Sequence, residues 1–173
     1  MNNLIQSDIE KEYDLKYPQI LYTYDYKTNE KIKIDEIQSL PVFSVDRKNI
    51  AYINTTNILV IWNLQTGSFI FEPCYLGDIS WSPDGQRIAF FNDANSLTVL
   101  DIQSGDKVNF QIEGSNLKWS PDGRTIALIS QKDLYLVDLE INEPYLLVEH
   151  NAGYYGTYRD YVGPGIRGIR WSS

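Results

Sequence analysis

The sequence predicts an all-β fold, a β-propeller segment made of four-stranded antiparallel blades. The pentapeptide Trp-Ser-Pro-Asp-Gly occurs at residues 81–85 and again, 38 positions later, at 119–123. A shortened copy begins at Trp171, and a weaker copy, Phe-Ser-Val-Asp at 43–46, lies 38 positions before the first. A repeat of this length, with strand-like runs between copies of a turn motif, is typical of propeller blades.

A second series of turns follows the same period. Each turn comes after a strand-like run (20–24, 58–62, 97–100 and 134–137) and begins with an Asp or Asn, at Asp25, Asn63, Asp101 and Asp138. Near the end of each turn stands Asn29, Gly67, Gly105 or Asn142. Asn and Gly tolerate a left-handed backbone best, so the same hairpin turn is predicted four times.

One full repeat contains four strands in order. Residues 78–82 form the first strand, and 82–85 form a turn with Pro83 second and Gly85 fourth, as a type I turn prefers. Residues 87–92 form the second strand, and the polar run 93–96 forms a loop. The third strand covers 97–102 and the fourth 107–112, joined by the turn 103–106.

This template divides the chain into an N-terminal extension, 1–18, and a propeller segment, 19–173. Full blades are expected at about 41–76, 77–114 and 115–149, with partial blades at 19–37 and 168–173. In the extension, Ser7 and Glu10 have the spacing of a capping box, which predicts a short helix through Glu12.

Composition excludes several classes of function. The 173 residues carry a net charge of −8, which repels phosphate backbones and argues against nucleic-acid binding. The single cysteine, Cys74, excludes an internal disulfide. The chain begins without a basic or apolar signal segment, and its longest apolar stretch, 58–62, is too short to span a bilayer. We therefore expect no membrane insertion and a cytoplasmic location, or a periplasmic one if a signal has been removed.

Residues 79–90 and 117–128 closely resemble the WD40-like PD40 repeat of TolB-type propellers and of the propeller domains of prolyl oligopeptidase relatives. The resemblance covers roughly 41–173 and implies a propeller, usually of six to eight blades. The Gly-His and Trp-Asp dipeptides of true WD40 repeats are absent. Three full blades are fewer than the family has, which fits a fragment, a truncated reading frame or an unusually small ring.

The repeat motif itself is interpreted as structural. We expect its tryptophans to wedge between blades and its Pro, Asp and Gly to hold turns rather than a metal. The residues concerned are Trp81, Pro83, Asp84, Gly85, Trp119, Pro121, Asp122, Gly123 and Trp171. Asp and Gly are adjacent here, whereas in a sialidase Asp-box another residue separates them.

No catalytic constellation is apparent, so we expect no enzyme activity, no cofactor and no metal. The one histidine, His150, has no identifiable nucleophile, and the sequence contains no Gly-x-Ser-x-Gly elbow. One His and one Cys cannot make the usual zinc site. Paired carboxylates for glycoside hydrolysis stay open, although no pair stands out.

The segment 150–170 is the candidate partner site. It lengthens the last repeat by 14 positions and joins two blades on the propeller face where loops commonly bind ligands. Its interface-type residues are Tyr154, Tyr155, Tyr158, Arg159 and Tyr161. An ordinary surface loop is the simpler alternative.

The predicted function is a non-catalytic scaffold for protein partners. The alternative is the gating propeller of a prolyl oligopeptidase-like serine hydrolase whose catalytic residues lie on sequence not included here. The partial blades at the two ends also predict ring completion, either as one composite fourth blade within a chain or by self-association of two chains.

Overall fold

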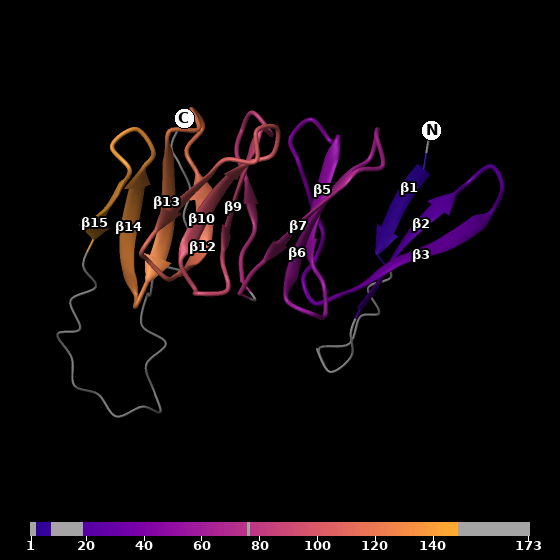
Figure 1. Ribbon diagram of the computed structural model, residues 1–173, viewed down its shortest axis with the longest axis horizontal. Coiled ribbons are helices and arrows are strands. Elements are labelled where there is room, and N and C mark those ends of the chain that lie inside the picture. The colour runs from indigo at the N-terminus through magenta and orange to yellow at the C-terminus, as the bar shows by residue number, and fades with distance from the viewer. Residues whose placement is uncertain (1–2, 8–18, 76, 149–173) are drawn as a thin grey trace, which may run out of the picture. The chain divides into compact units, whose positions relative to one another are not determined.

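The computed structural model describes residues 3–7, 19–75 and 77–148, and every element in these ranges is a β-strand (Figure 1). The predicted all-β class is confirmed. The chain divides into two compact units, Met1–Leu76 and Gly77–Ser173, which are described separately. No helix in the described ranges is long and apolar enough to cross a membrane. The expected partial blade at 168–173 and the candidate partner site at 150–170 lie outside the described residues.

The first unit begins with a three-stranded sheet in the order β1-β2-β3. Its strands are β1 (Asn3–Ser7), β2 (Gln19–Asp25) and β3 (Glu30–Ile37). Ser7, the expected N-cap of the predicted helix, ends β1 and pairs with Leu21. An N-cap residue has an extended backbone, so this pairing is compatible with the prediction. The helical residues expected after it lie outside the described residues.

A four-stranded sheet, β4-β5-β6-β7, follows in the same unit. Its strands are β4 (Val42–Phe43), β5 (Asn49–Ile53), β6 (Ile58–Asn63) and β7 (Phe69–Pro73). Tyr52 and Val60 of this sheet form one buried cluster with Leu21 and Ile37 of the first sheet. The hydrophobic effect therefore holds the two sheets together.

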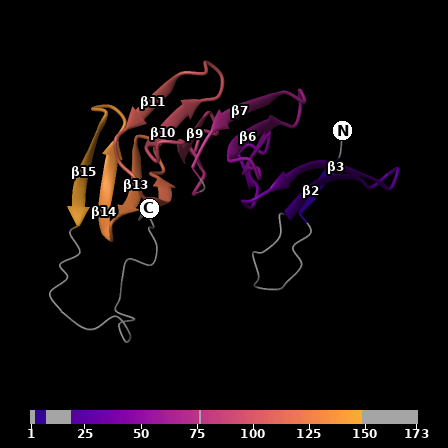
Figure 2. The same cartoon turned by 60° about the horizontal axis from the view of Figure 1, so that its bottom comes forward.

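The second unit contains two four-stranded antiparallel sheets of the same design (Figure 2). The first has β8 (Ser80–Trp81), β9 (Arg87–Phe91), β10 (Leu97–Asp101) and β11 (Lys107–Phe110). The second has β12 (Ser115–Trp119), β13 (Thr125–Ser130), β14 (Asp133–Asp138) and β15 (Glu143–Val148). Each strand pairs with its neighbour in sequence, so the predicted blade design is present twice.

One hydrophobic cluster joins the two blades of the second unit. The β8–β11 blade contributes what we call its forward face: Ala89, Phe91, Leu97, Val99 and Phe110. The β12–β15 blade contributes its backward face: Leu117, Trp119, Ile126, Leu128 and Val137. Period-two alternation places these residues on one side of each sheet.

The predicted left-handed turn positions are confirmed. Asn29, Gly67, Gly105 and Asn142 have φ of 59°, 74°, 79° and 56°. The Asp or Asn that opens each turn caps it. The Asp101 carboxylate, for example, accepts hydrogen bonds from the backbone N–H groups of Gln103 and Ser104, each at 2.9 Å. Because these hydrogen bonds form within one turn, each turn needs an Asp or Asn at its first position, and the period is therefore visible in the sequence.

Candidate functional site

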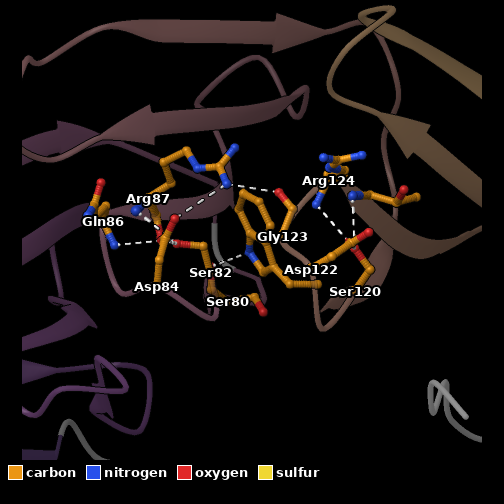
Figure 3. Close-up of polar contacts among 11 residues, drawn as sticks. Ser80, Ser82, Asp84, Gln86, Arg87, Ser120, Asp122, Gly123 and Arg124 are labelled. Carbon is orange, nitrogen blue, oxygen red and sulfur yellow. Dashed lines mark hydrogen bonds and ion pairs between the residues drawn. The ribbon is translucent and has the colours of Figure 1, made fainter. Parts of the chain in front are cut away.

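The Ser-x-Asp turns of the repeat motif form a closed local network (Figure 3). The Ser82 hydroxyl donates to Asp84 Oδ1 at 2.5 Å and accepts the Arg87 backbone N–H at 2.9 Å. Asp84 Oδ1 also accepts the Gln86 N–H at 2.9 Å. Gly85 completes the turn with φ +69°. The motif thus ties two strands together within one blade.

The other copies repeat this geometry. Ser120 donates to Asp122 at 2.6 Å, and Ser44 donates to Asp46 at 2.7 Å. Pro83 and Pro121, which are exposed, occupy the second position of their turns, and Gly123 has φ +70° like Gly85. In the weaker copy, a non-glycine residue, Arg47, takes the left-handed position with φ 57°.

A polar junction links the two blades of the second unit. The Arg87 guanidinium lies 5.0 Å from the centre of the Trp119 ring and donates to the Gly123 carbonyl oxygen at 2.8 Å. Trp119 Nε1 donates to the Ser80 carbonyl oxygen at 2.9 Å. At the exposed rim, the Asn116 N–H donates to the Asp78 carboxylate. The contacts of Arg87 and Trp119 satisfy partly buried polar groups between blades, which is a structural role.

The acidic residues of the motif are held ionised. For Asp84, partial burial raises the pKa, but the Ser82 hydroxyl, the Gln86 amide and the Arg87 charge outweigh it and lower the pKa overall. For Asp122, the Ser120 hydroxyl and then the Arg124 amide lower the pKa. A carboxylate whose pKa is lowered, and whose oxygens already accept hydrogen bonds within its own turn, is not suited to act as a general acid.

We expect these turns to weaken in acid. Because the pKa of Asp84 is lower in the folded chain, its stabilisation is complete above the unfolded pKa of about 3.9 and is lost as pH falls through the folded value. The Asp84→Ala variant should lose about 1 kcal/mol of unfolding free energy at neutral pH, since solvent screens this partly exposed group. Urea titrations at decreasing pH should show the deficit shrinking below the unfolded pKa. A deficit that stays constant with pH would contradict the assignment.

Among the described residues, we find no reactive thiol and no group of side chains that could hold a metal ion. Cys74 is buried, and burial raises the pKa of its thiol to about 11, so it is protonated and unreactive near neutral pH. No group of three His, Cys, Asp or Glu side chains in the described ranges is arranged to hold a metal ion. His150 lies outside those ranges, as do Tyr154, Tyr155, Tyr158, Arg159, Tyr161 and Trp171.

An exposed row of stacked aromatic rings is the feature that the sequence analysis missed. We call Trp62, Phe69 and Phe71 the aromatic ladder. The Trp62 and Phe69 ring centres are 5.5 Å apart, those of Phe69 and Phe71 are 5.9 Å apart, and both pairs are tilted by 12°. Phe69 is 42% exposed and Phe71 63% exposed. Phe69 and Phe71 lie on β7, the outermost strand of its sheet, and Trp62 lies beside Phe69 on β6.

The internal repeat shows that the fold does not need these rings. Phe69 and Phe71 correspond to Lys107 and Asn109 in the next repeat, 38 positions on, and those residues are also exposed. Trp62 Nε1 is buried and has no hydrogen-bond partner within the described part of the chain. An alignment of the repeats would have revealed the aromatic ladder, because these positions are aromatic in one repeat and polar in the next repeat along the sequence.

Comparisons with known proteins place the chain by its fold. No protein-family model matches the sequence, and no curated protein matches it either. Among solved structures, the chain is similar to dipeptidyl peptidase 4 of Porphyromonas gingivalis, with a TM-score of 0.59 and 14% identity. The match covers 83% of this chain and 30% of that one. Together with the four-stranded sheets, it supports a β-propeller fold, while the finer PD40 resemblance has no matching family model.

Proposed function

We propose that this chain is a non-catalytic interaction scaffold that binds protein partners, with the aromatic ladder as a contact surface. The observation that carries the proposal is the exposure of Phe69 and Phe71 at positions where the next repeat in the sequence has Lys107 and Asn109. Large exposed apolar groups cost solubility, so a surface that retains them is commonly an interaction site.

The ladder has the physical properties of a protein-binding anchor. Aromatic side chains bury a large area while losing few rotamers, which is why they dominate the binding energy of many interfaces. The nearly parallel stacking fixes the rings before a partner arrives, and this lowers the entropic cost of binding. The net charge of −8 argues for a protein rather than a nucleic acid as the partner.

The repeat supplies the substitutions that test this proposal. The double variant Phe69→Lys and Phe71→Asn introduces the residues of the next blade, so the fold should accept it. Proteins captured by the immobilised chain from its source cells should bind the variant at least about tenfold more weakly by biolayer interferometry. The control is Val108→Asn, which changes an apolar residue of similar exposure (41%) on another outermost strand. Unchanged affinity in a folded double variant would refute the ladder as a contact surface.

The Tyr-rich segment remains a second proposed contact surface of the same scaffold. The residue types at Tyr154, Tyr155, Tyr158, Arg159 and Tyr161 support it. Alanine substitution of these five residues, measured in the same binding assay, separates its contribution from that of the ladder.

A second candidate function is the propeller part of a serine hydrolase. The similarity to a peptidase supports it, as does the observation that the match covers only 30% of that longer chain. In this case the catalytic nucleophile would lie on other sequence. Hydrolytic activity of the purified chain would contradict the scaffold proposal. A Gly-x-Ser-x-Gly elbow encoded downstream would favour the hydrolase.

A further inference from the structure

We propose that β7 binds an extended segment of the protein partner, which adds to the sheet as a further antiparallel strand beside the aromatic ladder. This inference rests on the proposed function, because it names the form of partner that the ladder binds. In this mode the backbone of the added segment pairs with the outer edge of β7, and its alternate side chains cover the rings. The segment bound is therefore extended and apolar at every second position.

The hydrogen bonds of β7 leave two of its residues facing outward. Antiparallel strands alternate between pairs that exchange backbone hydrogen bonds and pairs that do not. The Asn63 N–H donates to the Ser68 carbonyl oxygen at 2.8 Å, which fixes this alternation for β6 and β7. Counting from that bond, Phe69 and Phe71 fall in pairs without hydrogen bonds to β6. Their N–H and C=O groups therefore point away from β6, and no described strand pairs with that edge.

The rings lie where an added strand would place its side chains. Residues directly opposite each other on neighbouring strands have side chains in contact on the same face. A strand paired with Phe69 and Phe71 therefore sets two of its side chains, one residue apart, against the two rings. Both rings are exposed, so apolar side chains there would remove ring surface from water. Trp62 stacks on Phe69 from β6 and supports the row.

The other outermost strands, β3, β11 and β15, carry features that discourage strand addition. In the repeat, the positions of Phe69 and Phe71 hold Lys31 and Lys33 on β3, Lys107 and Asn109 on β11, and Pro144 and Leu146 on β15. Lysine, proline and irregular pairing are common protections of a sheet edge. β3 and β15 also have a register shift in their pairing, whereas β7 pairs with β6 without one. Of these four described edges, β7 is the one suited to accept a strand.

Pro73 limits the length of the added strand. It is the next outward-facing position of β7, it is exposed, and it has no N–H group to donate. Phe69 and Phe71 thus offer two donors and two acceptors to a partner. Because each backbone hydrogen bond adds little net free energy in water, binding at so short an edge depends on the rings as well. The site therefore selects segments with large apolar side chains rather than any extended chain.

The first test uses a fluorescein-labelled peptide, Lys-Thr-Trp-Thr-Trp-Thr-Lys, titrated with the full chain and followed by fluorescence polarisation. Its tryptophans can lie opposite Phe69 and Phe71, and its lysines suit a chain of net charge −8. We expect saturation with a dissociation constant below about 1 mM. Methylating both tryptophan amide nitrogens removes the donors aimed at β7 and should weaken binding at least about tenfold. In the control peptide two threonine amides, which point away from β7, are methylated instead, and binding should be kept.

Amide hydrogen exchange, followed by NMR, observes the same contact from the side of the chain. Without peptide, the amides of Phe69 and Phe71 should exchange quickly, and that of Ile70, which pairs with β6, slowly. Saturating peptide should slow exchange at Phe69 and Phe71 at least about tenfold. The equivalent amides of β11, at Lys107 and Asn109, are the matched control and should not change.

The variant Phe69→Lys and Phe71→Asn, with its fold checked by circular dichroism, separates the possible failures. If it binds the peptide as well as the original chain does, the ladder is not a contact surface and the proposed function fails too. If it loses binding but the position of the methyl groups makes no difference, the rings bind without strand addition, and only this inference is overturned. A peptide that does not saturate overturns it as well. Protection of the two amides on concentrating the chain without peptide would assign the edge to a second copy instead.

Discussion

Replacing Trp119 with Ala should lower the free energy of unfolding by about 4 kcal/mol, a loss typical of a buried tryptophan. The ring is 7% exposed and belongs to the cluster that joins the two blades of the second unit. The substitution also removes the hydrogen bond to the Ser80 carbonyl oxygen and the ring beneath the Arg87 guanidinium. Chemical denaturation monitored by circular dichroism measures the loss.

Trp62→Ala is the matched control for this prediction. Trp62 is half-buried, and its Nε1 has no hydrogen-bond partner among the described residues, so the same truncation should cost clearly less. Trp119→Phe should recover part of the loss, because it restores the ring but not the donor. Equal losses at Trp119 and Trp62 would show that Trp119 does not hold the blades together.

Gly114→Ala should lower the free energy of unfolding by about 3 kcal/mol, because the added methyl group overpacks the second unit. A Cβ at this position would lie 2.6 Å from the Ile129 carbonyl oxygen and 2.7 Å from Leu128 Cδ1. The first contact is with backbone inside a sheet, and Leu128 is fully buried, so neither can retreat easily. Differential scanning calorimetry should show a clear fall in Tm.

Gly105→Ala separates crowding from backbone strain. Its Cβ would meet nothing within 4 Å, but its φ of +79° is unfavourable for alanine. The expected cost is therefore about 1 kcal/mol, from strain alone. If Gly114→Ala costs no more than Gly105→Ala, the close approach of Gly114 to β13 is not present in solution.

Local chemistry explains which features the sequence could predict. The turns at Asn29, Gly67, Gly105 and Asn142 depend on residues within one hairpin, so their period is visible in the sequence. The Ser82–Asp84 contact is likewise internal to one turn. In the repeat from β8 to β11, the expected strands 87–92 and 97–102 agree closely with β9 and β10, whereas β8 and β11 are shorter than the expected 78–82 and 107–112.

Features that depend on position in the sheet could not be predicted in the same way. The exposure of Phe69 and Phe71 follows from β7 being the outermost strand, and a strand pattern alone does not say which strand has an open edge. β1 was missed because it carries no turn motif, and pairing with β2 defines it. Gly114 is similar, since the backbone contact that requires glycine is with Ile129, on the following strand of the blade.

The consecutive pairing of strands also has a kinetic consequence. From β8 to β11, and again from β12 to β15, every strand pairs with its neighbour in the sequence. The hydrogen bonds between these blades join residues 36, 38 and 39 positions apart, about one repeat. Contact order is therefore low for an all-β chain, which favours rapid folding. During synthesis, each blade should form as soon as its own repeat has left the ribosome, and the next blade should then dock onto a finished surface.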